Sequence, residues 1–198
     1  MADSSMNTIG WDQGQWTHPP VNVHPEGTDL CVEAVEGSDV WRVTSYGFVH
    51  DTEHALVVPM ANPGAVEVRF LAEFEEQFDQ AGIFLTGADD LWVKAGVEFA
   101  DGTPQLGAVV TNPHSDWSVA AVPDWIGREV TVRASRSGDA VTIRARVEGE
   151  DFRLVRVVPI PSDVDLAAGP MVCAPTRAGL VVRFTGWWQG AADSSLHP

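Results

Sequence analysis

The sequence predicts an all-β protein, a two-sheet antiparallel jelly-roll β-sandwich. Apolar and polar residues alternate with a period of two in several segments, short turn-forming stretches separate these segments, and no segment shows an apolar stripe with the 3.6-residue period of a helix. A chain of 198 residues fits one such domain. We place it at residues 10–189 and expect flexible ends at 1–9 and 190–198, where the residues are small or polar and show no period.

The individual strands follow from this alternation. It is clearest at residues 66–74, and again at 130–135 and 141–147, which flank a turn at 137–139 and therefore predict a hairpin. Glutamates cluster at 71–78, which we interpret as the end of a strand followed by a loop. Further strands are expected at 29–35, 40–50, 54–60, 79–86, 91–99, 105–111, 117–122, 152–159, 170–174 and 179–188.

The charge of the chain excludes some classes of partner. Its formal net charge is −16, and Lys94 is the only lysine. Binding of nucleic acid or of an anionic membrane requires basic surface, so neither is expected. The arginines concentrate at 128–156, which predicts one locally basic edge. No segment has the ~20 apolar residues of a membrane span, and residues 1–7 lack a basic start and an apolar core, so we expect a cytoplasmic protein.

The sequence indicates no cofactor and no metal. Cys31 and Cys173 lie in apolar segments and are best interpreted as small buried hydrophobes, with a disulfide as the alternative. His50 and His54 are four residues apart, but a strand and a turn do not bring them to one face as a helix would. Calcium binding is an alternative that the sequence leaves open, because several predicted loops are acidic, although no loop shows a spaced series of calcium ligands.

The most unusual side chains lie on one face of the strand predicted at 91–99. Trp92, Lys94, Gly96 and Glu98 share this face. Glycine inside a strand often marks the close approach of a ligand or of another backbone. The neighbouring predicted strands hold Gln80 with Gly82 and Gln105 with Gly107, so strands in register would form a trough with a glycine floor and walls at Gln80, Trp92, Lys94 and Glu98. The alternative is that the glycines only permit bulges or close packing of sheets.

Two further groups of residues have a weaker claim on this trough. Arg42, Tyr46 and His50 share one parity along the extended strand predicted at 40–50. Trp117 enters a predicted strand directly after the turn at 112–114. For each of these residues a purely structural contact is the competing interpretation.

Several of these residues also carry a resemblance to a known family. The sequence resembles the family called domain of unknown function 1349, of the concanavalin A-like lectin/glucanase superfamily, over about residues 16–188. The matching segments, in chain order, are Ser38-Asp39-Val40-Trp41-Arg42, Thr44-Ser45-Tyr46-Gly47-Phe48, Phe78-Asp79-Gln80-Ala81-Gly82, Trp92-Val93-Lys94-Ala95-Gly96-Val97-Glu98 and Ser115-Asp116-Trp117-Ser118. Val40, Ser45 and Phe78 depart from the usual residues of the family. The resemblance implies a jelly roll with a concave face for a ligand; one fungal member is linked to enolase regulation, and any activity carried over would be analogy from the fold.

Three functions are compatible with these residues. The first is a noncatalytic module that binds a carbohydrate or a small polar metabolite on the concave face. The second is an enzyme acting on a glycan or metabolite, with Glu98 as general acid or base and Lys94 tuning its charge. The Glu-x-Asp-x-x-Glu pattern of the superfamily's glucanases is absent from the sequence. The third is a regulatory domain that binds another protein, or a second copy of itself, through an exposed sheet edge or through the hairpin at 128–147 that carries Arg133, Arg144 and Arg146.

Overall fold

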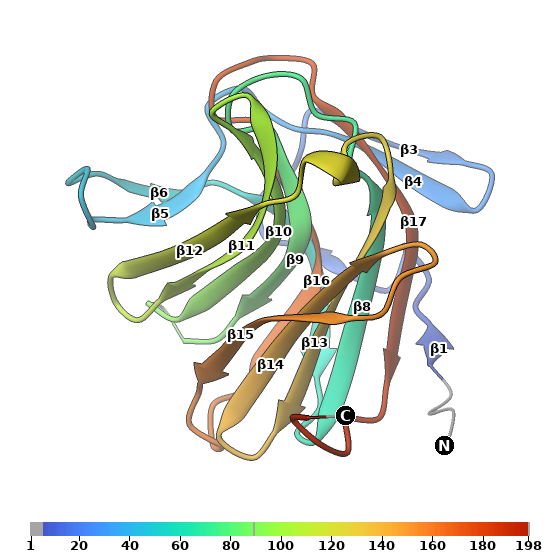
Figure 1. Cartoon of the computed structure of the whole chain (residues 1–198), viewed down its shortest axis with the longest axis vertical. Coiled ribbons are helices and arrows are strands. Elements are labelled where there is room, and N and C mark those ends of the chain that lie inside the picture. Colours follow the sequence, from blue (N-terminus) through green and yellow to red (C-terminus); the bar gives the residue numbers. More distant parts are fainter. Residues whose placement is uncertain (1–5, 89, 198) are drawn as a thin grey trace.

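The computed structural model describes residues 6–88 and 90–197, and two antiparallel sheets packed face to face form its body (Figure 1). The first sheet has the strand order β15 (Arg153–Pro159), β14 (Ala140–Val147), β13 (Glu129–Ser137), β8 (Gly64–Leu71), β17 (Val181–Gly190), β4 (Asp29–Glu33) and β3 (Asn22–Glu26), with β1 (Asn7–Thr8) beside β17. The second has the order β12 (Ser115–Ala121), β11 (Thr103–Thr111), β10 (Trp92–Ala100), β9 (Gln80–Thr86), β16 (Leu166–Cys173), β7 (His54–Met60) and β2 (Gln15–Trp16). The predicted all-β sandwich is confirmed.

The core lies between the two sheets and follows the alternation seen in the sequence. Val66, Val68 and Phe70 of β8 point inward from the first sheet, and Val93 and Val97 of β10 point inward from the second. All of them are buried in one continuous cluster. Burying such a side chain stabilises the fold by roughly 1.5–3 kcal/mol, so the paired apolar faces fix which side of each strand faces the core.

The hairpin predicted around residues 137–139 is confirmed. Strands β13 and β14 pair in an unbroken register that ends with Ser137 opposite Ala140. Gly138 has a φ of 62°, the left-handed conformation that a two-residue hairpin turn requires.

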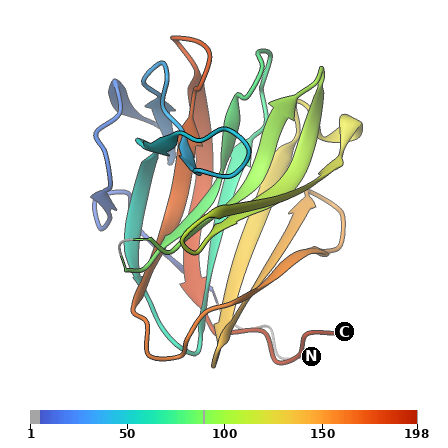
Figure 2. The same ribbon diagram turned by 90° about the vertical axis from the view of Figure 1, so that its left-hand side faces the viewer.

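The strand predicted at residues 40–50 is instead a hairpin. It consists of β5 (Val40–Arg42), β6 (Val49–Asp51) and the loop 43–48, which together we call the arm. Val43, Ser45 and Gly47 have φ values of 67°, 63° and 76°, so alternate residues of the loop are left-handed and the chain reverses. The arm lies across the outer face of the second sheet (Figure 2). The parity argument that joined Arg42, Tyr46 and His50 therefore fails.

The two ends differ from the expectation of loose segments. Thr8 pairs with Trp188, and Ile9 is buried in the core. Near the other end, the carboxylate of Asp193 accepts hydrogen bonds from Nε of Arg133 at 2.8 Å and Nε of Arg144 at 3.1 Å. Residues 6–9 and 193 are thus anchored to the first sheet, whereas the expectation for residues 1–5 and 198 lies outside the described residues.

The predicted basic edge is largely neutralised within the chain. Nη1 of Arg133 donates to Glu67 Oε1 at 2.8 Å, and its Nε donates to Asp193. The guanidinium of Arg146 lies over the ring of Phe152, 4.3 Å from its centroid. The arginines of β13 and β14 therefore support the first sheet rather than forming a free cationic surface.

Two other expectations concern single features of the chain. Cys31 and Cys173 are buried free thiols, as the interpretation as small hydrophobes predicted. Within the described part of the chain, helices long and apolar enough to cross a membrane are absent.

A buried ion pair holds the loop that precedes β9. Nε and Nη2 of Arg177 donate to the two carboxylate oxygens of Asp79 at 2.9 and 2.7 Å, and the backbone N–H groups of Glu75 and Glu76 donate to Oδ2 at 3.1 Å. Burial alone would raise the pKa of Asp79, but these hydrogen bonds outweigh it and hold the pKa below its ordinary value.

This ion pair predicts a pH-dependent contribution to stability. Because the folded state lowers the pKa of Asp79, its contribution is present above the unfolded pKa of about 3.9 and is lost as the pH falls through the folded pKa. We expect Arg177→Gln to lower the free energy of unfolding by about 1–2 kcal/mol at pH 7. Urea unfolding at several pH values checks this, since the gap between wild type and variant must narrow below about pH 4. A gap that stays constant down to about pH 2.5 would contradict the assignment.

Candidate functional site

The arm divides the outer face of the second sheet into a covered and an open part. Under the arm, Val40 packs on Phe84, Trp92 and Met171 in a small apolar cluster separate from the main core. Trp92 is only 4% exposed there. The expectation that Trp92 walls a trough is corrected, because the arm, which sequence reasoning took for a strand of the sheet, covers its ring.

The three glycines are in register as expected. Gly96 of β10 lies opposite Gly82 on β9 and opposite Gly107 on β11. A Cβ atom added to Gly96 would lie 2.7 Å from the Cα of Gly82 and would collide with the carbonyl oxygen of Ala81. The groove above the glycines holds only about 20 Å³. The glycines thus allow close approach of neighbouring strands within one sheet, and the paired registers of β9, β10 and β11 show neither the bulges nor the sheet-to-sheet packing of the alternative interpretation.

A larger hollow of about 210 Å³ lies beside the glycines, between the arm and strands β9 to β12. Its polar floor and aromatic walls come from Asp39, Trp41, Tyr46, Phe48, Phe78, Gln80, Lys94, Glu98, Val109 and Trp117. Gln80, Lys94, Glu98, Tyr46 and Trp117 were singled out from the sequence, and the fold brings them together here.

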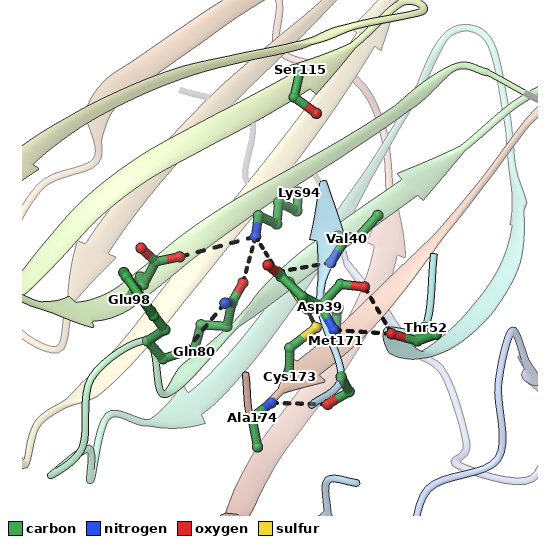
Figure 3. A network of polar contacts seen from close by, with 12 residues as sticks. Asp39, Val40, Thr52, Gln80, Lys94, Glu98, Ser115, Met171, Cys173 and Ala174 are labelled. Atoms are coloured by element: carbon green, nitrogen blue, oxygen red, sulfur yellow. Dashed lines mark hydrogen bonds and ion pairs between the residues drawn. The ribbon is translucent and has the colours of Figure 1, made fainter. Parts of the chain in front are cut away.

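A lysine-centred polar network forms the floor of the hollow (Figure 3). Nζ of Lys94 donates to Gln80 Oε1 at 2.8 Å and to Asp39 Oδ1 at 3.0 Å, and it lies 4.0 Å from Glu98 Oε2. Register explains part of this arrangement, since Gln80 pairs directly with Glu98 across β9 and β10. The amide of Gln80 is fixed in turn because its Nε2 donates to the carbonyl of Phe78.

Burial and charge act in opposite directions on the two ionisable groups of β10. Burial alone would lower the pKa of Lys94, but the carboxylates of Asp39 and Glu98 outweigh it and raise this pKa. For Glu98, burial raises the pKa and the ammonium of Lys94 opposes it only in part, so the pKa stays above its ordinary value. Of the two roles considered for Glu98, general acid or general base, the raised pKa favours the general acid.

Aromatic side chains form the wall of the hollow. The ring of Trp41 meets Trp117 and Tyr46 edge to face, with centroids 6.4 and 5.7 Å apart. Tyr46 stacks on Phe48 at 5.3 Å and is 62% exposed. Trp117 is also exposed. Exposed ring faces beside a polar floor provide both an apolar plate and hydrogen-bonding groups.

Two of the predicted site residues support the arm from outside the hollow. Arg42 forms an ion pair with Asp90, with 2.9 Å between Nη1 and Oδ1. His50 contacts the ring of Phe48 edge-on at 4.6 Å. Neither residue lines the hollow, because the chain reversal within the arm turns these two side chains to other contacts.

Sequence reasoning did not assign five lining residues to the site, which are Asp39, Trp41, Phe48, Phe78 and Val109. Asp39 is 55 positions from Lys94 in the sequence, and no local sequence pattern predicts that the two side chains are in contact. The available signal was the resemblance to the family, since the segments 38–42, 44–48 and 78–82 contain Asp39, Trp41, Phe48 and Phe78. Ser38 helps to place the segment 38–42, since the Ser38 hydroxyl accepts a hydrogen bond from the backbone N–H of Ala174.

Fold and site together define a two-sheet antiparallel β-sandwich with an aromatic hollow on the outer face of one sheet. Residues 16–190 match the family described as Protein of unknown function (DUF1349), and the chain belongs to this family. It is 37% identical over 175 residues to Regulation of enolase protein 1 from Saccharomyces cerevisiae, covering 88% of each chain.

Solved structures show the same fold. A functionally unknown protein from Saccharomyces cerevisiae superposes with a TM-score of 0.87 at 34% identity, over 94% of this chain and all of the other. A GH43 protein, BlXynB, from Bacillus licheniformis gives a TM-score of 0.71 at 9% identity, over 93% of this chain but 39% of the other. At this identity the second likeness shows a shared fold alone.

Proposed function

We propose that the hollow binds a carbohydrate or another small, uncharged, polyhydroxylated molecule, and that the protein acts as a noncatalytic, lectin-like module. The observation that supports this most directly is the combination of exposed aromatic rings with a buried amide, ammonium and carboxylate set. Ring faces of Tyr46 and Trp117 suit the apolar C–H faces of a sugar, and Gln80, Lys94 and Glu98 offer donors and acceptors for hydroxyl groups.

Size and charge narrow the class of ligand. The hollow of about 210 Å³ is smaller than the ~300 Å³ at the lower end of drug-sized sites, which favours a single sugar unit or the end of a chain. The floor holds two carboxyl groups, those of Asp39 and Glu98, and one ammonium, that of Lys94, so an anion would find no excess of positive charge there. An anionic ligand is therefore disfavoured against a neutral one.

Tryptophan fluorescence offers a direct test with a panel of mono- and oligosaccharides. Removing the ring of Trp117 should weaken binding about fivefold, since aromatic contacts of this kind contribute on the order of 1 kcal/mol. The matched control is Trp188→Ala, because Trp188 lies on the first sheet and contacts Arg69. Equal affinity in Trp117→Ala and wild type would contradict the proposal, as would the absence of binding across the panel.

The raised pKa of Glu98 favours a second candidate, an enzyme in which this carboxyl donates a proton to a leaving group. Aryl glycosides and a metabolite panel test it: turnover that disappears in Glu98→Gln would support catalysis. Turnover that persists in Glu98→Gln, or is absent in wild type, would exclude this role.

A further inference from the structure

A second group of potential ligands lies outside the hollow, where the segment after β2 meets the junction of β6 and β7. The backbone N–H of Thr17 donates to the carbonyl of Ala55 at 2.9 Å, and its hydroxyl donates to the carbonyl of Glu53 at 3.2 Å. These contacts bring His18 against Asp51 and Glu53. None of the three lines the hollow, so a ligand held by this group is independent of the proposed function.

Glu53 is the unusual member of this group. It is only 1% exposed, and its Oε2 has no hydrogen-bond partner among the described residues. No lysine or arginine of the described chain pairs with it; the group beside it that can carry a positive charge is the imidazole of His18, with 3.6 Å between Nδ1 and Oε1. A buried carboxylate is costly unless it takes up a proton or a cation or hydrogen-bond donors compensate it, so a bound cation is one of the ways to relieve the cost of burying Glu53.

We propose that His18, Asp51 and Glu53 bind a divalent transition metal ion, with Zn²⁺ as the best fit. One ligand atom from each residue lies within 4.8 Å of the others. Zn²⁺ accepts imidazole nitrogen and carboxylate oxygen at about 2.0–2.2 Å, which separates neighbouring ligands by roughly 3.5 Å in a tetrahedron. The 3.6 Å between His18 Nδ1 and Glu53 Oε1 already meets this spacing. Nδ1 also lies 3.0 Å from the backbone carbonyl of Glu53, so to bind the ion it gives up that hydrogen bond and the imidazole takes the tautomer with its proton on Nε2. The exposed Asp51 reaches the ion by a side-chain rotation.

A competing cluster has the same spacing but different surroundings. His24, Glu26 and Cys31 also lie within 4.8 Å of one another. There, however, Arg183 donates to Glu26 Oε1 at 3.2 Å, and the Cys31 thiol donates to Oε2 at 3.4 Å. Both oxygens of Glu26 are therefore engaged, and the guanidinium repels a second cation. The cluster of His24, Glu26 and Cys31 is therefore expected to bind a cation more weakly than the cluster around Glu53.

The test is a calorimetric titration of the chelator-treated full chain with ZnCl₂. We expect one Zn²⁺ per chain in wild type. Binding should be at least tenfold weaker in His18→Ala and in Asp51→Asn, each of which removes one ligand group. Both positions are exposed or half-exposed, so neither change should disturb the core. His24→Ala and Cys31→Ser should bind as wild type does. Because the ion would join residue 18 to the base of the arm, Zn²⁺ should also raise the melting temperature of wild type and not of His18→Ala.

Two results would overturn the proposal. One is the absence of stoichiometric binding in wild type, and the other is binding that survives His18→Ala but is lost in His24→Ala or Cys31→Ser. Melting temperatures measured in chelator show whether each variant still folds, so a folding defect is not mistaken for a lost ligand.

Discussion

Replacing Gly96 by alanine is expected to lower the free energy of unfolding by about 3 kcal/mol or more. The added Cβ would lie 2.7 Å from the Cα of Gly82 and would collide with the Ala81 carbonyl. Both obstacles are backbone atoms of the neighbouring strand, which cannot move aside as a flexible side chain would. Strands β9 and β10 would have to separate in the middle of the second sheet, so the cost should reach or exceed the upper end of ordinary overpacking.

Urea unfolding followed by tryptophan fluorescence measures this effect. The matched control is Gly102→Ala, because Gly102 lies in the turn after β10, with a φ of 78° and no atom within 4 Å of an added Cβ. Its substitution should cost only the strain of a left-handed alanine, roughly 1–2 kcal/mol. Equal costs at the two positions would show that the strands do not approach as closely as the register of the glycines indicates.

The sequence predicted those strands that bury one face. Residues 66–70 and 93–97 alternate because every second side chain enters the core, and this period is visible in any one strand alone. Strand β3 (Asn22–Glu26) was missed because all five of its residues are exposed and Pro25 interrupts the pattern. Edge strands that pack against nothing carry no alternation to detect.

The strand residues of the site were predicted from the sequence, whereas the residues on and next to the arm were not. Lys94 and Glu98 stand out on β10 because a core strand has no need of them, and pairing of β9 with β10 brings Gln80 beside them. The arm was beyond local reasoning: its reversal depends on left-handed Val43 and Ser45, and neither residue type signals such a conformation. The sequence therefore predicted neither the burial of Trp92 under the arm nor the contact of Lys94 with Asp39, the residue that precedes the arm.

Removing the ammonium of Lys94 should have the other large effect. Its side chain is 8% exposed and lies between two largely buried carboxylates, those of Asp39 and Glu98, at 3.0 and 4.0 Å. Lys94→Met keeps the length of the chain but leaves both carboxylates without their cation. Removing one partner of a buried ion pair typically costs about 3–5 kcal/mol, so we expect a loss of this order at pH 7.

The pH dependence of the unfolding free energy of Lys94→Met distinguishes the loss of the ammonium charge from a simple packing defect. Burial already raises the pKa of Glu98 against the opposing effect of Lys94, so without the ammonium Glu98 should take up a proton more readily as the pH falls from about 7 toward 5. Protonation removes one unpaired charge, and the deficit relative to wild type should shrink. Adding Glu98→Gln to Lys94→Met should likewise recover part of the loss at pH 7. A deficit that is the same at pH 5 and pH 7, and that Glu98→Gln does not reduce, would mean that the lysine stabilises the arm by packing rather than by its charge.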